Sequence, residues 1–295
     1  ILITKAIKTG HILKTFYRIL ELLFKQFPNE PVLASVRQSM LGELRNIPAS
    51  ISQPHVVAVQ GVHDPLFFSL FAAIMVDLRK ISGVSGRLLL VNSINSAVGV
   101  GWKQSFLRSL PLTWIVTSKW ARANRELVGP VGYRSNSLLH PVGDIIDWIS
   151  AGRIWTQLQT SPDISKFEFE GVLIGDLVID SYLRFKPSPE FKISDTFVRR
   201  ILWQALRDVR RARLFFKDER PDLYLTSYST YVEHGVAVRV ALACNVPVRA
   251  YGNLMTFGKN LHLSDFYHVT DTSKYRQDFD NLDRQESRLS EAEQQ

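Results

Sequence analysis

Short apolar runs alternate along residues 55–251 with longer segments that carry an apolar residue at every third or fourth position. Short apolar runs bounded by turn residues are typical of buried strands, whereas the longer spacing is typical of amphipathic helices. The predicted strands are Val56–Val59, Arg87–Val91, Leu112–Val116, Val172–Ile174, Leu223–Thr226 and Val246–Tyr251. The predicted helices are one that begins at Pro65, then Gly101–Leu110, Lys119–Leu127, Asp144–Leu158, Ser194–Phe216 and Glu233–Cys244. Because parallel neighbours need crossover connections, this alternation predicts an α/β fold: a Rossmann-like, mainly parallel sheet of roughly five or six strands flanked by helices.

A helical extension is predicted before this domain. Apolar residues recur at helical spacing between Leu13 and Phe27, lysines and an arginine lie between them, and a second helical stretch covers Val32–Leu44. The first helix either packs on the domain or lies on a membrane surface as a basic, interfacial helix. The resulting division is a helical extension over residues 1–54, one Rossmann-like domain over 55–270, and a polar, helical tail or linker over 271–295.

The predicted helix Ser194–Phe216 combines an apolar stripe with many arginines. Ser194 is a suitable N-cap, and the arginines occupy much of the surface outside the stripe. Long arginine stems can cover apolar surface while their charged heads stay in water. We therefore expect the basic face of this helix to be mostly solvated.

One polar cluster follows the predicted strand Val172–Ile174. Gly175 permits a tight turn or the close approach of a ligand to the backbone. In a helix, Asp176 and Asp180 share a face, and Arg184 extends that row by one turn. Such carboxylates can bind sugar hydroxyls or act as a general base. The alternative is structural: Asp176 caps the helix and Asp180 pairs with Arg184 at the surface.

A second polar cluster, Tyr228, Tyr231, Glu233 and His234, follows the predicted strand Leu223–Thr226. Aromatic rings offer flat apolar faces to sugar rings, and the other two side chains supply acid, base or hydrogen-bonding groups. A helix that begins nearby also directs peptide N–H groups towards an anionic oxygen. In the alternative interpretation, Tyr231 packs in the core and Glu233 supports the start of the helix.

A third cluster, Gln60–Asp64 with Gly61, follows the first predicted strand, and His63 and Asp64 are a candidate base and its orienting carboxylate. The alternative is that His63 is a hydrogen-bonded structural histidine. Since ligands bind where parallel strands end, the three clusters are expected to border one cleft. His262 and His268 are expected on the surface or in loops, and the histidines show no metal-ligand spacing. No dinucleotide-binding or P-loop glycine motif and no nucleophile-elbow motif is present in the sequence.

Composition narrows the class of protein and partner. The 295 residues are 45% hydrophobic and 22% charged, which is typical of a globular protein with a sizeable core. The net charge of +8 suits an anionic partner such as a sugar nucleotide, a lipid diphosphate or the inner membrane surface. One cysteine, Cys244, excludes an internal disulfide and is expected in the core. No apolar run reaches the roughly 20 residues of a membrane span, so we expect a cytoplasmic protein, with peripheral attachment to the inner membrane as an alternative. The start at Ile1 suggests a fragment of a longer protein.

The chain resembles the N-terminal half of glycosyltransferase-like proteins of bacterial surface polysaccharide synthesis, the capsule and O-antigen type with a GT-B architecture. The matching segments are Ile174–Arg184 (IGDLVIDSYLR), Pro221–Val248 (PDLYLTSYSTYVEHGVAVRVAL followed by NVPV) and the tyrosine-containing Tyr267–Phe279. The likeness covers residues 55–290. In such proteins two Rossmann-like domains face each other, the first holding the acceptor and the second the sugar-nucleotide donor. We expect no second such domain in the residues after 270, so that the chain is either truncated or a half-enzyme that needs a partner.

The resemblance implies an acceptor-binding half of a glycosyltransferase. His63, Asp64 and Asp176 are then the catalytic candidates. The candidates for contact with a saccharide or lipid-linked acceptor are Gly61, Gly175, Asp180, Arg184, Tyr228, Tyr231, Glu233 and His234. We expect no cofactor on this chain, the sugar nucleotide being held by a missing C-terminal domain. The alternatives are a non-catalytic carbohydrate-binding or assembly protein on the same fold and, from the charge and the arginine-rich helix only, a nucleic-acid-associated protein, although no nucleic acid is expected as a partner.

Overall fold

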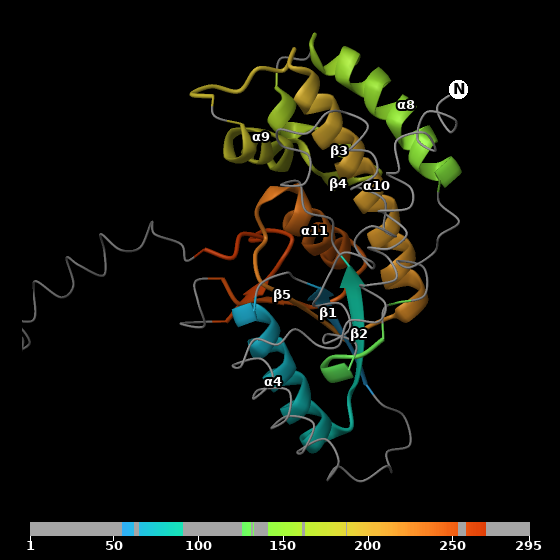
Figure 1. The fold of residues 1–295 in the computed structure, drawn as a ribbon, viewed down its shortest axis with the longest axis vertical. Helices are drawn as coiled ribbons and strands as arrows, with labels where there is room; N and C mark the ends of the chain where they lie inside the picture. Colours follow the sequence, from blue (N-terminus) through green and yellow to red (C-terminus); the bar gives the residue numbers. More distant parts are fainter. Residues whose placement is uncertain are drawn as a thin grey trace, which may run out of the picture.

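The computed structural model describes residues 55–61, 65–90, 126–130, 132, 141–160, 163–186, 188–252 and 258–269. Several predicted elements lie outside these residues: the helical extension over 1–54, the helix Gly101–Leu110, the strand Leu112–Val116, most of the helix Lys119–Leu127 and the tail over 271–295. The ribbon of the described part is shown in Figure 1.

A five-stranded sheet forms the centre of the fold, as predicted. In spatial order its strands are β2 (Ser85–Leu90), β1 (Val56–Gly61), β5 (Leu223–Thr226), β6 (Val248–Ala250) and β7 (Lys259–Leu261). The first four run parallel, and β7 pairs antiparallel with β6. The α/β class with a mainly parallel sheet is therefore confirmed, and β7 is an edge strand that the sequence did not predict.

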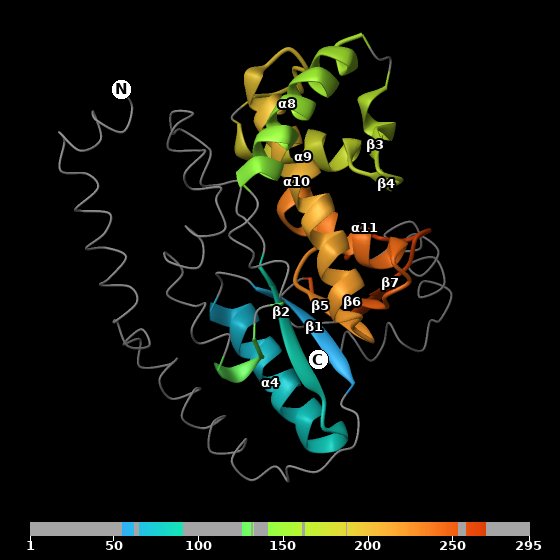
Figure 2. The same cartoon turned by 90° about the vertical axis from the view of Figure 1, so that its right-hand side faces the viewer.

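Helices cover both faces of this sheet. Val57 and Val59 of β1 pack with Phe71 of α4 (Pro65–Ser82), whereas Ala58 belongs to the core formed with α10 (Thr196–Glu219) and α11 (Val236–Ala243). This alternation follows from the two-residue repeat of a strand. Figures 1 and 2 show α4 on one side of β1 and β2, and α10 with α11 on the other.

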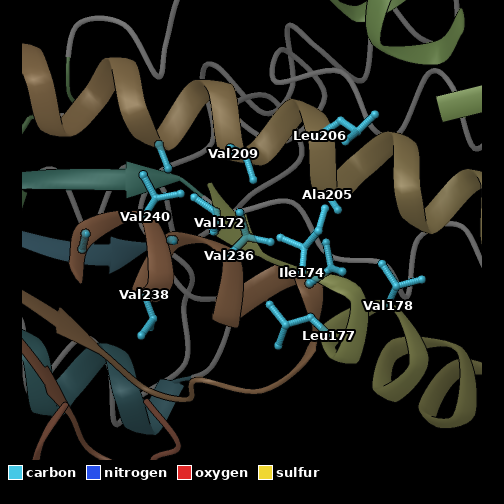
Figure 3. Close-up of a cluster of buried hydrophobic side chains, with 14 of the residues drawn as sticks. Val172, Ile174, Leu177, Val178, Ala205, Leu206, Val209, Val236, Val238 and Val240 are labelled. Atoms are coloured by element: carbon cyan, nitrogen blue, oxygen red, sulfur yellow. The ribbon is translucent and has the colours of Figure 1, made fainter. Parts of the chain in front are cut away.

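A smaller group of elements gathers around the N-terminal half of α10, away from the sheet (Figures 1 and 2). It contains α8 (Pro141–Leu158), the short helix η3 (Ile164–Lys166), the hairpin of β3 (Glu168–Phe169) with β4 (Val172–Leu173), and α9 (Gly175–Phe185). The apolar strand at Val172 was predicted, but its place in the central sheet was wrong, since among the described strands it pairs with β3 alone. In Figure 3, Val172, Ile174 and Leu177 lie with Leu206 of α10 and Val236 of α11 in one buried cluster.

The starts of two predicted helices and the burial of one residue need correction. The side chain that caps α10 is that of Asp195, which accepts a hydrogen bond from the Phe197 amide at 2.9 Å, and not that of Ser194. The predicted helix Glu233–Cys244 begins as a wide π-type turn, η4 (Tyr231–Gly235), before α11. Cys244 is only partly buried, and burial raises the pKa of its thiol.

The expectation of a solvated basic face on α10 is wrong for two of its arginines. Arg207 and Arg211 are buried because α8 lies across this face, and the guanidinium of Arg211 donates to both oxygens of Asp144 at 3.0 and 3.1 Å. Arg210 pairs with Asp147, also on α8. Arg210 and Arg211 therefore join α10 to α8 through charged hydrogen bonds.

None of the helices in the described ranges is long and apolar enough to cross a membrane.

Candidate binding site at the carboxyl edge of the sheet

The order of the strands marks one place on the sheet edge. From β1 the chain passes through α4 to β2 on one side, whereas β5 and β6 lie on the other side of β1 and are linked through α11. The direction of winding thus reverses between β1 and β5. In open parallel sheets, ligands bind beyond the carboxyl ends of the strands at such a switch point.

Gln60 joins the carboxyl ends of β1 and β5. Its side chain is fully buried, and its Oε1 accepts hydrogen bonds from Thr226 Oγ1 at 3.0 Å, from the Ser227 amide at 3.1 Å and from Ser227 Oγ at 2.8 Å. Its Nε2 lies 3.0 Å from Nδ1 of His234. Gln60 therefore connects the carboxyl ends of β1 and β5 to His234.

The wide turn η4 places His234 over this edge. The turn begins at Tyr231, whose φ of 60° is left-handed, and the Val232 amide donates to Ser181 Oγ of α9 at 2.8 Å. A Cβ on Gly235 would lie 2.5 Å from Leu177 and from the Ser229 carbonyl oxygen, so only glycine fits there. Wide turns of this kind are frequent at functional sites.

Tyr228 is the aromatic centre of the site. Its ring makes edge contacts with Phe67 at 5.3 Å, with His234 at 5.6 Å and with His268 at 5.1 Å between centroids. Phe67 comes from α4 and His268 from the segment after β7, so the ring brings together three segments far apart in the sequence. The cluster of Gln60, Tyr228, Glu233, His234 and His268 is called the edge cluster below.

His268 lies in a loop after β7, one of the two expected places, but it is buried there, with 6% of its surface exposed, so the alternative of a surface position is wrong. Its Nδ1 accepts from the Ser229 amide at 3.2 Å, and its own amide donates to Ser229 Oγ at 2.7 Å. Burial is the largest cause that lowers the pKa of His268, and the nearby charges of His234 and Lys259 lower it further. The sequence held no signal for this, because only the antiparallel return of β7 brings residue 268 to the strand ends.

Glu233 and His234 present adjoining polar groups. Glu233 Oε1 lies 3.4 Å from His234 Nε2, and their side chains are 12% and 17% exposed. A carboxylate is an acceptor, and a neutral imidazole offers one donor and one acceptor. The pair therefore offers groups of both kinds within a partly exposed part of the edge cluster.

Asp176 lies in α9 and is held by an ion pair. Its two oxygens each accept from Arg239 of α11 at 2.5 Å, and Oδ2 also accepts from the Tyr267 hydroxyl at 2.8 Å. Burial acts to raise the pKa of Asp176, but the hydrogen bonds and charge of Arg239, with the Tyr267 hydroxyl, lower it overall. Asp176 is linked to the edge cluster through the neighbours Tyr267 and His268. Its catalytic role stays a prediction.

The other residues predicted around Asp176 take separate places. Burial and the charge of Asp176 raise the pKa of Asp180, in agreement with the shared helix face. Arg184 is exposed near the end of α9. Gly175 does permit a close approach, but of backbone, because a Cβ there would lie 1.8 Å from the Ile164 carbonyl oxygen. The ring of Tyr231 contacts Phe185 of α9, with centroids 6.0 Å apart.

The third predicted cluster is described only at Gly61, the buried last residue of β1, which pairs with Leu90. His63 and Asp64 lie outside the described residues. Within the described ranges, the ends of β1 and β5 meet His234 through the side chain of Gln60. A common cleft for the three clusters stays a prediction. No group of three histidine, cysteine, aspartate or glutamate side chains there is placed to hold a metal ion.

Comparison with known proteins gives no relative: no family model, no curated protein and no solved structure matches this chain.

Proposed function

We propose that this chain is the acceptor-binding half of a glycosyltransferase of bacterial surface polysaccharide synthesis, and that a saccharide acceptor binds at the edge cluster. The observation that carries the proposal is the position of Tyr228, Glu233 and His234 at the switch point between β1 and β5. Binding sites commonly combine apolar and aromatic walls with a few polar groups that fix the orientation of the ligand.

The chemistry of the edge cluster suits a hydroxylated ligand. A sugar hydroxyl donates one hydrogen bond and accepts others, and Glu233 with His234 offers an acceptor beside an imidazole N–H. The Tyr228 ring supplies an apolar surface of the kind that packs against a sugar ring. The proton of the acceptor hydroxyl would pass to His63 or Asp64, which remain the predicted bases at the end of β1.

The donor side of the reaction needs a different structure. Glycosyl transfer requires positive or N–H groups that stabilise the departing nucleoside diphosphate, and the sequence contains no phosphate-cradling glycine loop. We therefore propose that a C-terminal domain or a partner protein holds the sugar nucleotide. The chain alone is expected to bind acceptor weakly and to transfer no sugar.

Titration calorimetry with oligosaccharide fragments of capsule or O-antigen polysaccharide tests the binding site. His234→Ala and Tyr228→Ala should each weaken binding by about tenfold, since one lost hydrogen bond or ring contact is worth about 1–1.5 kcal/mol. His55→Ala is the matched control, because His55 precedes β1 at the opposite edge of the sheet and pairs there with Asp222. Equal affinities of wild type and His234→Ala would contradict the proposed site.

The second candidate is a non-catalytic carbohydrate-binding or assembly protein, favoured by the lack of a phosphate-binding loop in the sequence. Both functions predict acceptor binding. A donor-hydrolysis and transfer assay separates them when the purified protein is mixed with the protein that holds the donor: turnover supports the enzyme, and binding without turnover supports the second candidate.

A further inference from the structure

The side-chain amide of Gln60 can take only one orientation. Its Oε1 faces the backbone N–H of Ser227 at 3.1 Å, and a backbone N–H can only donate. If the amide were flipped, its NH₂ group would face this donor, and the hydrogen bond from the Ser227 amide would be lost. The oxygen is therefore fixed towards β5, and the NH₂ group is fixed towards His234.

This orientation determines which nitrogen of His234 carries the proton. Gln60 Nε2 donates to His234 Nδ1 at 3.0 Å, so Nδ1 must offer its lone pair. A neutral imidazole has one N–H and one bare nitrogen. The proton of neutral His234 is consequently on Nε2, the nitrogen that lies 3.4 Å from the carboxylate of Glu233.

The same argument applies to two other histidines: His268 has the tautomer of His234, and His55 has the other one. Nδ1 of His268 accepts from the Ser229 amide at 3.2 Å, so neutral His268 also carries its proton on Nε2. Nδ1 of His55 lies 3.2 Å from a carboxylate oxygen of Asp222 and must be the protonated nitrogen. The chain thus contains histidines of both tautomers, and in each one the group that contacts Nδ1 determines which nitrogen is protonated.

We propose that Gln60 is a positioning residue that keeps the proton of neutral His234 on Nε2. In this form His234 donates a hydrogen bond to an oxygen of the saccharide and removes no proton from it. The tautomer of His234 follows from the geometry, whereas the hydrogen bond from His234 to the saccharide rests on the proposed function. A hydroxyl oxygen of the ligand accepts from His234 Nε2–H, and its hydrogen points to a carboxylate such as Glu233. The ligand recognised in this way is a neutral polyol rather than a compound that presents only donors.

Nitrogen-15 NMR of the histidine rings in the whole chain tests the tautomer directly, at a pH of about 8, above the ordinary histidine pKa of about 6.5. His234 and His268 should each show a bare Nδ1 and a protonated Nε2, and His55 should show the reverse. His234→Ala, His268→Ala and His55→Ala assign the signals. A protonated Nδ1 in wild-type His234 would overturn the proposal, and this measurement needs no folded variant at position 60.

Gln60→Glu then tests the role of Gln60. A carboxylate that accepts from Ser227 also presents an oxygen to His234, so Nδ1 of His234 should gain a proton, while the signals of His268 stay as in wild type. Affinity for the oligosaccharides should fall by about tenfold, as for loss of one hydrogen bond. An unchanged His234 signal in a folded Gln60→Glu protein would refute the positioning role. If the tautomers are as expected but no oligosaccharide binds, the proposed function fails and the tautomer assignment stands.

Discussion

Asp176→Asn should destabilise the fold, because this carboxylate is the counter-charge of a buried arginine. Arg239 has a side chain that is 4% exposed, and its guanidinium donates to both oxygens of Asp176, to the Leu173 carbonyl oxygen at 2.7 Å, and lies 4.2 Å from the ring centre of Phe266. Asparagine keeps the shape but removes the negative charge. The ion pair links α9 to α11, so its loss loosens two elements at once.

The magnitude follows from the burial of the pair. Removing one partner of a fully buried ion pair costs about 3–5 kcal/mol, but Asp176 is 20% exposed, and asparagine can still accept one hydrogen bond. We therefore expect a loss of about 3 kcal/mol in the free energy of unfolding, which lowers the melting temperature by about 6–12 °C for a domain of this size. The pKa of Asp176 is lowered in the folded state, so its contribution is present above the ordinary aspartate pKa of about 3.9 and is lost as the pH falls through the folded value.

Urea unfolding at neutral pH, followed by circular dichroism, measures this loss. Glu190→Gln is the control, since Glu190 forms an exposed pair with Lys192 at 3.3 Å that should contribute less than about 1 kcal/mol. A double-mutant cycle with Arg239→Met isolates the coupling of the two charges. If Asp176→Asn costs no more than Glu190→Gln, the assignment of Asp176 as a structural counter-charge is refuted.

Three further predictions concern stability. The pKa of His268 is lowered in the folded state, so the protein should lose stability as the pH falls below about 6.5, where the unfolded chain gains a proton that the folded one does not. Urea midpoints measured at two pH values should therefore depend less on pH for His268→Asn than for wild type. Gly175→Ala should cost about 3 kcal/mol or more, since its Cβ would meet backbone atoms of the preceding turn, whereas Gly171→Ala, in open space at φ 71°, should cost about 1–2 kcal/mol in the same assay. Asp144→Asn should cost about 3 kcal/mol by leaving the buried Arg211 without its counter-charge, and a change below 1 kcal/mol would contradict that interpretation.

The α/β class and most of the strands could be predicted from hydrophobic pattern alone. The strand Leu223–Thr226 was predicted with its observed ends, and the helix from Pro65 begins where the proline suggested. These elements have strong periodicity and turn residues at their limits. The hairpin strand at Val172 is equally apolar, and pattern alone could not show that it packs on α10 instead of joining the sheet.

The candidate site could be predicted only in part. Tyr228, Glu233 and His234 follow a clear strand, and their place at its carboxyl end was expected from topology. Gln60 could not be recognised as a site residue from the sequence, because an amide side chain within a strand resembles any polar residue of an edge strand. The arginines of α10 were misread for a related reason: the acidic residues that neutralise them come from α8, more than fifty positions earlier in the chain. Pairings across such distances depend on tertiary packing, which local sequence patterns do not encode.

The central claim is that a saccharide acceptor binds at the carboxyl edge between β1 and β5. Hydrogen exchange read by mass spectrometry, with and without saturating oligosaccharide fragments of capsule or O-antigen polysaccharide, tests it most directly because it locates the ligand without a variant. The account predicts slower exchange in Thr226–Gly235 and in the segment around His268, with α8 unchanged. Protection confined to α8 or to other segments remote from these strand ends, or no protection with any oligosaccharide, would contradict it.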